Sequence, residues 1–179
     1  MFYEREKEVE VWSIKLPHES KNIPFRPASF SVVLPVCSMI RFYTDGVELP
    51  HLDEKRLTRW ISSVAADYGF SLGDINYIFC SDERILAVNR QFLGHDYYTD
   101  IITFDYSTAD RIAGDIYISL QTVESNSKEF AETNPEMSDA ELHRILIHGI
   151  LHLTGQADKT PETRAEMTRK EDLALAKLI

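Results

Sequence analysis

The sequence has few cysteines and no long hydrophobic segment. Two cysteines, Cys37 and Cys80, occur among 179 residues, too few for a disulfide framework, so a reducing compartment is expected. No apolar run approaches the roughly 18 residues that a membrane-spanning helix needs. We therefore expect a cytoplasmic protein that has no membrane partner. Repeats and low-complexity tracts are also absent, as is typical of a single globular domain.

Positive charge is scarce. Lysine and arginine number 19 against 29 aspartates and glutamates, which gives a formal net charge of −10. This balance argues against a protein that binds nucleic acid through a broad basic surface. It leaves open a local electropositive cleft made by a metal ion and a few basic side chains.

The first 38 residues differ from the rest of the chain. Their five acidic and five basic side chains cancel, so the whole net charge falls on residues 39–179. The apolar segment Phe30–Cys37 is interrupted by Pro35 and has no A-x-A cleavage site, which argues against a signal peptide. We interpret Met39 as the natural start and residues 1–38 as an extension outside the core domain. The alternative is that this extension supplies an edge strand.

From residue 39 onward, hydrophobic periodicity alternates between strands and helices. Strands are expected at 40–43, 75–80, 101–105 and 112–118, and helices at 53–70, 81–92, 119–132 and from 139. A Ser138–Glu141 capping box predicts the start of the last of these helices. The pattern predicts one α/β or α+β domain over residues 39–179, with a small sheet covered by helices.

The strongest chemical signal is the segment 148–158, HGILHLTGQAD. His148 and His152 are four residues apart on an expected helix, so they project from one face one turn apart. Two imidazoles at this spacing can bind one ion at about 2 Å. Gly155 can end the helix in a left-handed conformation, after which Asp158 can offer a carboxylate oxygen.

These residues predict a metal site on a central helix and the loop after it. Three protein ligands leave a fourth position for water, which is typical of a catalytic zinc site. The alternative is a pair of core histidines and an aspartate that begins a turn.

The same spacing matches the metzincin pattern H-E-x-x-H-x-x-G-x-x-H. Gly149 stands where such a protease has its general-base glutamate, and Asp158 stands where it has a third histidine. The missing glutamate argues against peptide hydrolysis, because that side chain activates the metal-bound water.

The segment also resembles the signature of the YbeY family, H-G-x-L-H-L-x-G-x-D-H, with Met167 and Glu171 at the family's offsets in the last helix. A second family block, L-N-x-x-Y-R-x-K-D-x-P-T-D-V-L-S-F, aligns with residues 88–104. A third, G-D-I-x-I-S, is present at residues 114–119. The resemblance covers residues 39–179 and leaves 1–38 unmatched.

YbeY proteins are metal-dependent endoribonucleases that mature ribosomal RNA. The resemblance implies a mixed sheet with helices around it and one Zn²⁺ ion per chain, held by His148, His152 and Asp158. It implies cleavage of single-stranded RNA near the 3′ end of small-subunit rRNA. The implied partners are ribosomal RNA, the small ribosomal subunit and ribosome-associated proteins.

Two positions depart from the family pattern. The family's third histidine ligand matches Asp158, whose negative charge would make the metal a weaker acid toward its water. The family's arginine in the second block matches Leu93. Such an arginine is expected to hold phosphate or to stabilise charge in the transition state, and leucine can do neither. His95, aligned with the family's lysine, and Arg90 are the candidate replacements.

We predict a metal-dependent, single-strand-specific endoribonuclease of rRNA processing and ribosome maturation, with His148, Asp100 and His95 as catalytic residues. Asp100, Thr103 and Asp115 either line the cleft or serve as strand-end caps. The alternative function is a non-catalytic, metal-containing ribosome assembly factor. Another metal hydrolase is disfavoured by Gly149 and by the lack of H-x-E and P-C-x-x-C motifs.

Overall fold

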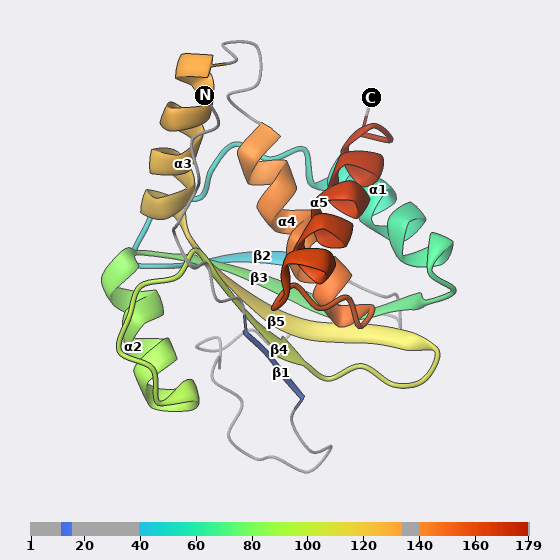
Figure 1. The fold of residues 1–179 in the computed structure, drawn as a ribbon, viewed down its shortest axis with the longest axis horizontal. Coiled ribbons are helices and arrows are strands. Elements are labelled where there is room, and N and C mark those ends of the chain that lie inside the picture. Colours follow the sequence, from blue (N-terminus) through green and yellow to red (C-terminus); the bar gives the residue numbers. More distant parts are fainter. Residues whose placement is uncertain (1–11, 16–39, 134–139, 179) are drawn as a thin grey trace.

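The computed structural model describes residues 12–15, 40–133 and 140–178 (Figure 1). The described strands are β1 (Trp12–Lys15), β2 (Ile40–Asp45), β3 (Ser71–Cys80), β4 (Ile101–Asp105) and β5 (Arg111–Ser119). The described helices are α1 (Glu54–Asp67), α2 (Asp82–Leu93), α3 (Leu120–Thr133), α4 (Ala140–Leu153) and α5 (Pro161–Leu175).

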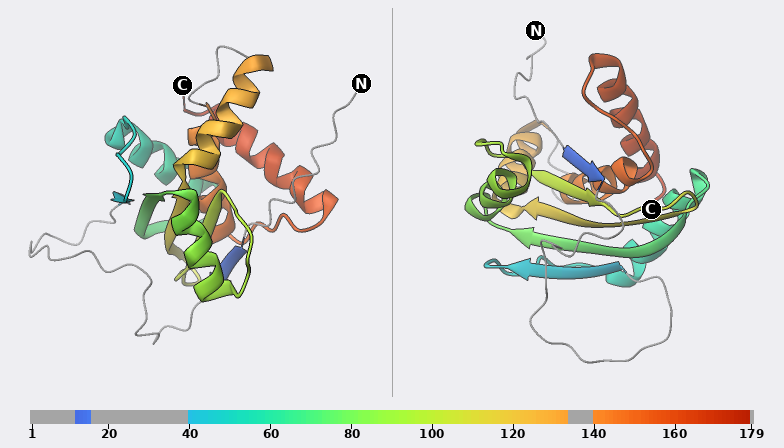
Figure 2. Two further views of the ribbon diagram at one scale, coloured as in Figure 1. Left: turned by 90° about the vertical axis from the view of Figure 1, so that its left-hand side faces the viewer. Right: turned by 90° about the horizontal axis from the view of Figure 1, so that it is seen from below.

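The strands form one mixed sheet in the order β1-β4-β5-β3-β2. Strand β4 runs antiparallel to β5, whereas β1 with β4, β2 with β3 and β3 with β5 are parallel. Figure 2 shows β1 and β2 at opposite edges of this sheet. The predicted α+β class, with a small mixed sheet and surrounding helices, is confirmed.

The two faces of the sheet have separate cores, because successive strand side chains point to opposite faces. On β3, Tyr77 and Phe79 belong to the larger core, with residues of α1 and α4. Ile78 and Cys80 belong to the smaller core, with residues of α2. Helix α4 therefore lies against the sheet, and α5 packs on α4 (Figure 1).

Helix α4 approaches the sheet closely at Gly149. A Cβ added to this glycine would lie 3.0 Å from two side-chain carbons of Ile116 and 3.2 Å from Cδ1 of Ile101. These contacts are tighter than ordinary van der Waals packing. Gly149 therefore faces the sheet, and a glutamate at this position would be driven into the larger core.

Most expected elements agree with the structure to within a few residues. Asp53 caps α1 by accepting from the Arg56 amide, and Ser81 caps α2 by accepting from the Arg84 amide. The proposed capping residue Ser138 lies outside the described residues. Strand β1 falls within the segment interpreted as an extension, and its backbone pairs with β4. No described helix is both long enough and apolar enough to cross a membrane.

Candidate metal centre

Helix α4 ends in a turn that places the segment after it. Gly155 adopts a φ of +93°, as predicted. The Gln156 amide donates to the Leu151 carbonyl at 3.0 Å, and the Gly155 amide donates to the His152 carbonyl at 2.9 Å. These two bonds define a Schellman motif, which satisfies the last carbonyls of the helix and reverses the chain. The reversal brings Asp158 back beside the histidines of α4.

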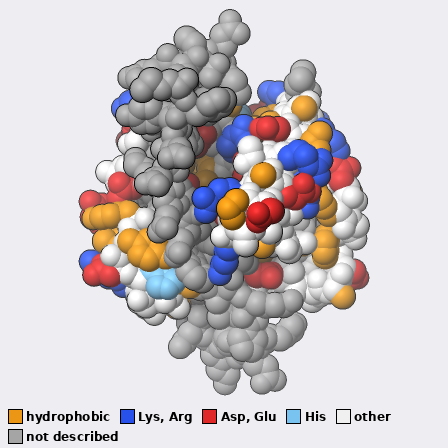
Figure 3. Space-filling view, viewed as in Figure 1, with side chains coloured by type: hydrophobic (Ala, Val, Ile, Leu, Met, Phe, Trp, Pro, Cys, Tyr) orange, Lys and Arg blue, Asp and Glu red, His pale blue; other side chains and the backbone are white. Residues whose placement is uncertain are grey.

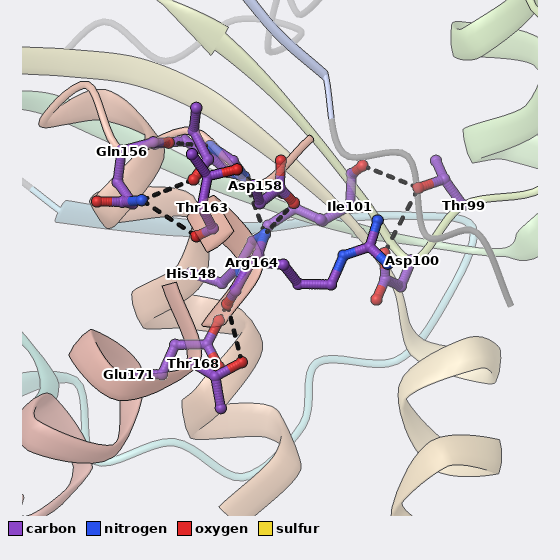
Figure 4. Close-up of polar contacts among 12 residues, drawn as sticks. Thr99, Asp100, Ile101, His148, Gln156, Asp158, Thr163, Arg164, Thr168 and Glu171 are labelled. Carbon is purple, nitrogen blue, oxygen red and sulfur yellow. Dashed lines mark hydrogen bonds and ion pairs between the residues drawn. The ribbon is translucent and has the colours of Figure 1, made fainter. Parts of the chain in front are cut away.

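Three candidate ligand atoms converge at this point. Figure 4 labels two of the residues that supply them, His148 and Asp158. Nε2 of His148 and Nε2 of His152 are 2.9 Å apart, and each is 3.8 Å from Oδ2 of Asp158. Ligands about 2.0–2.1 Å from a tetrahedral ion are separated by about 3.3 Å. The cluster fits one ion after shifts of about half an ångström, and its two imidazoles and one carboxylate suit zinc among other divalent metals.

The outer nitrogen of each imidazole has a partner that fixes the ring. Nδ1 of His148 donates to Oε1 of Glu171 at 2.6 Å, and Nδ1 of His152 donates to the Gln156 carbonyl at 2.8 Å. A carbonyl only accepts, so Nε2 of His152 carries a lone pair aimed at Nε2 of His148. Such a pair requires a shared proton or a shared cation. The geometry therefore fits a metal ion.

The charges of the cluster are set by burial and by the neighbouring acids. Burial and the nearby His148 lower the pKa of His152 to about 3, which keeps this imidazole neutral. Burial also disfavours the charged form of His148, but the hydrogen bond and charge of Glu171 outweigh it and raise the pKa of His148. Burial raises the pKa of Asp158. A divalent ion would offset these costs by converting all three groups into ligands.

Glu171 is held in turn by an arginine one helical turn before His148. Nη1 of Arg144 donates to Oε2 of Glu171 at 2.9 Å, while Nη2 donates to Asp172 at 2.8 Å. Glu171 is only 6% exposed. The hydrogen bonds from Arg144 to Glu171 and from His148 to Glu171 join α5 to α4 and orient the first candidate ligand.

A cleft opens on each side of the cluster. One has a volume of about 180 Å³ and includes Asp100, His148, Asp158 and Arg164 among its lining residues. The other, of about 220 Å³, is lined by His152, Asp158 and the turn after α4, together with Asp105 and Lys159. The first cleft therefore reaches the cluster at His148 and Asp158, and the second reaches it at His152 and Asp158.

Of the further predicted catalytic residues, the structure brings Asp100 to the cluster and does not bring His95. Asp100 lies at the start of β4, and burial raises its pKa while the charge of His148 lowers it. The imidazole of His95 stacks on Tyr97, with ring centroids 5.3 Å apart, and lines neither cleft. Both catalytic assignments stay predictions.

The candidate replacements for the family arginine are engaged elsewhere. Leu93 packs against the smaller core at the end of α2. Arg90 forms an ion pair with Asp96 and lines neither cleft around the cluster. The second block therefore places no arginine side chain in either cleft.

The two remaining polar candidates lie on opposite faces of the sheet. Asp115 is paired with Phe104 of the smaller core and accepts hydrogen bonds from Asn76 at 2.8 Å and from Tyr106 at 3.1 Å. It belongs to a network on the face away from α4. Thr103 is fully buried, and its hydroxyl has no partner among the described residues.

Three residues around the cluster were not assigned a role from the sequence. Glu171 was noted only as a family match in the last helix, 23 residues after the histidine it orients. Arg144 lies four residues before His148, a spacing that places both on one helix face. Arg164 lies in the first turn of α5, and no local pattern marks it as part of the site.

Comparisons with known proteins agree on one family. The family model "Endoribonuclease YbeY" matches residues 43–179. A protein of that name from Phocaeicola vulgatus is 56% identical over 138 residues, which are 77% of this chain and 97% of the relative. One from Bacteroides thetaiotaomicron is 53% identical over 76% of this chain and 97% of its own length. A Thermotoga maritima protein of known solution structure is 28% identical, with a TM-score of 0.55 over 78% of this chain and 89% of its own.

Proposed function

The chain belongs to the YbeY endoribonuclease family, and we propose that it is a zinc-dependent, single-strand-specific endoribonuclease. Its proposed substrate is the 3′ end of small-subunit ribosomal RNA, and its proposed role is ribosome maturation. We further propose that residues 39–179 form the catalytic domain and that residues 1–38 are an extension to it. The observation that carries the proposal is the convergence of Nε2 of His148, Nε2 of His152 and Oδ2 of Asp158 between two open clefts.

Each group around the cluster has a separate task. His148, His152 and Asp158 would hold the ion, while Glu171 and the Gln156 carbonyl keep the imidazole Nδ1 protons outward and both Nε2 lone pairs inward. A bound zinc ion would supply Lewis-acid polarisation of a phosphoryl oxygen and a water of lowered pKa.

Asp100 is the carboxyl group best placed to exchange a proton beside the ligands. It lies in the same cleft as His148 and Asp158, and its pKa is raised because the carboxyl is buried. A carboxyl group with a raised pKa holds a proton at a higher pH than an exposed one and can return it to a leaving oxygen. We propose this as its role.

The test is a cleavage assay on the purified full-length chain loaded with one equivalent of zinc. A single-stranded RNA with the precursor sequence at the small-subunit 3′ end should be cut, a duplex of the same sequence should not, and chelator should abolish cleavage. His152→Ala should lose both metal and activity. His143→Ala is the matched control, because this histidine is on the same helix but packs its ring edge against Trp60.

Two outcomes would overturn the proposal. Stoichiometric zinc with no metal-dependent cleavage would favour a non-catalytic assembly factor that binds the ribosomal subunit. Full metal content in His152→Ala would show that the ligand set is wrong.

A further inference from the structure

The cleft beside His148 contains more negative than positive side chains, although a ribonuclease must admit a phosphodiester there. Asp100, Glu141, Asp158 and Glu171 line it, against two arginines, Arg144 and Arg164. A polyanion therefore needs a positive group in this cleft that is not already neutralised.

Arg144 cannot fill that need. Its two terminal nitrogens are bound to Glu171 and Asp172, and its side chain is 22% exposed. Because the same guanidinium fixes the carboxylate that orients His148, turning it toward a substrate would disturb the first ligand.

Arg164 is in a different situation. It is exposed, and among the described residues no carboxylate lies within ion-pair distance of its guanidinium. The next arginine of α5, Arg169, forms a two-nitrogen pair with Glu166 at 2.6 and 2.9 Å. Figure 4 shows the Arg164 side chain extending from α5 across the cleft toward Asp100.

We propose that Arg164 binds the RNA phosphate at the metal centre and so replaces, from α5, the arginine that the family pattern places where this chain has Leu93. A planar guanidinium with free donors matches two phosphate oxygens at once. The inference rests on the proposed function, whose substrate contact it specifies.

The mixed charge of the surrounding surface supports a single local contact. Over α5, lysine and arginine side chains alternate with aspartate and glutamate instead of forming a continuous basic patch (Figure 3). Lys170 is held by Gln156 at 2.6 Å, and Lys177 by Asp67. Of the two arginines that line this cleft, Arg164 is the one without an ion pair among the described residues. Its removal should therefore have a large effect compared with removal of a paired arginine.

The test compares zinc-loaded wild type, Arg164→Ala, Arg164→Lys and Arg169→Ala. Arg169→Ala removes the same charge from the same helix outside the cleft. Binding is measured by fluorescence anisotropy with a labelled single-stranded DNA 12-mer over a series of salt concentrations. Such a probe has the backbone phosphates and lacks the 2′-hydroxyl groups. Zinc content is measured on every sample.

For Arg164→Ala we expect Kd for the DNA to rise about five- to tenfold. The negative slope of the logarithm of the association constant against the logarithm of the salt concentration should become shallower by about 0.7, the value for one phosphate on a single strand. Arg164→Lys should restore the slope and only part of the affinity, because lysine binds as a point charge. Zinc content should not change, and Arg169→Ala should behave as wild type.

Two results would overturn the inference. One is an Arg164→Ala variant that binds the DNA with the same affinity and salt slope as Arg169→Ala. The other is an Arg164→Ala variant that loses its zinc, because Arg164 would then support Asp158 instead of binding phosphate. The proposed function fails separately. A wild-type protein that cuts no RNA, while Arg164→Ala still weakens DNA binding, would refute the nuclease and leave the phosphate contact standing.

Discussion

Glu171 on α5 accepts a hydrogen bond of 2.6 Å from Nδ1 of His148 on α4. The carboxylate is 6% exposed and is held on its other oxygen by Arg144. A ligand histidine whose outer nitrogen donates to a carboxylate is a stronger and better oriented ligand than a free imidazole. The proposed metal affinity of the cluster would therefore depend on Glu171, a residue of a helix that supplies none of the three proposed ligand atoms.

Glu171→Gln should weaken zinc binding about 10- to 100-fold, because the neutral amide keeps the shape and removes the charge behind His148. Competition with a chromogenic chelator measures this affinity. Asp172→Asn is the control, since Asp172 binds the same arginine but is 59% exposed and does not touch the histidine. Equal zinc affinity in Glu171→Gln and wild type would contradict the orienting role.

Removal of the metal should lower the stability of the folded chain. Zinc that binds only the native state at about 100 times its Kd adds about 2.7 kcal/mol. Thermal unfolding with and without chelator measures the difference. The melting temperature of His152→Ala should not respond to zinc, whereas that of His143→Ala should respond as wild type does. A chelator effect of equal size in His152→Ala would place the stabilising metal elsewhere.

Gly149→Ala should destabilise the domain. The added methyl group enters the contact with Ile116 and Ile101, at a typical overpacking cost of about 1–3 kcal/mol, whereas alanine gains about 1 kcal/mol over glycine in a helix. We expect a net loss of about 1 kcal/mol by urea unfolding. In the double variant with Ile116→Val the two losses should be less than additive, because removing Cδ1 makes room. Strict additivity would argue against this contact.

Tyr106→Phe should give a loss of stability that depends on pH. Burial raises the pKa of Asp115, and the hydrogen bonds from Asn76 and Tyr106 lower it by favouring the charged form. Without the Tyr106 hydroxyl the native pKa of Asp115 rises further, so the carboxylate is held less well once it is ionised. The loss should be about 1.5–3 kcal/mol near pH 7 and should shrink as the pH falls through the native pKa and Asp115 is protonated. Urea unfolding at pH 4 and pH 7 checks this, and an equal loss at both values would be inconsistent with it.

Deletion of residues 1–38 should leave a cooperatively folding domain that still binds zinc. Only Trp12–Lys15 of that segment are described, as a four-residue strand at the edge of the sheet. We expect the melting temperature to fall by no more than a few degrees, corresponding to about 1 kcal/mol or less. A large fall would show that β1 is part of the core domain.

The sequence predicted the local features of this molecule well. The helix periodicity of α1 and α4, the left-handed Gly155 and the spacing of His148 and His152 are properties of neighbouring residues, so they are visible in a short window. The strand order is not, because it depends on how distant segments pair. The parallel pairing of β1 with β4 joins residues about 90 positions apart.

The candidate site also has a part that is local in the sequence and a part that depends on how distant segments pack. The three proposed ligands come from one stretch of 11 residues and could be recognised from spacing and resemblance. The roles of Glu171 and Arg164 depend on the packing of α5 against α4, which no pattern in the sequence encodes. The two candidate replacements for the family arginine were chosen from alignment and spacing. In the structure Arg90 is paired with Asp96, and His95 stacks on Tyr97.

The Schellman turn after α4 makes this loop more sensitive to its length than to the side chain at position 158. Gln156 donates its amide proton to end the helix, accepts from His152 with its carbonyl and binds Lys170 with its side chain. An inserted or deleted residue between Gly155 and Asp158 would undo the helix end, the imidazole tautomer and the ligand position together. A change of side chain at position 158 disturbs neither the helix end nor the imidazole tautomer. The proposed third ligand can therefore be exchanged without changing the helix end or the imidazole tautomer, provided that the number of residues in the turn stays the same.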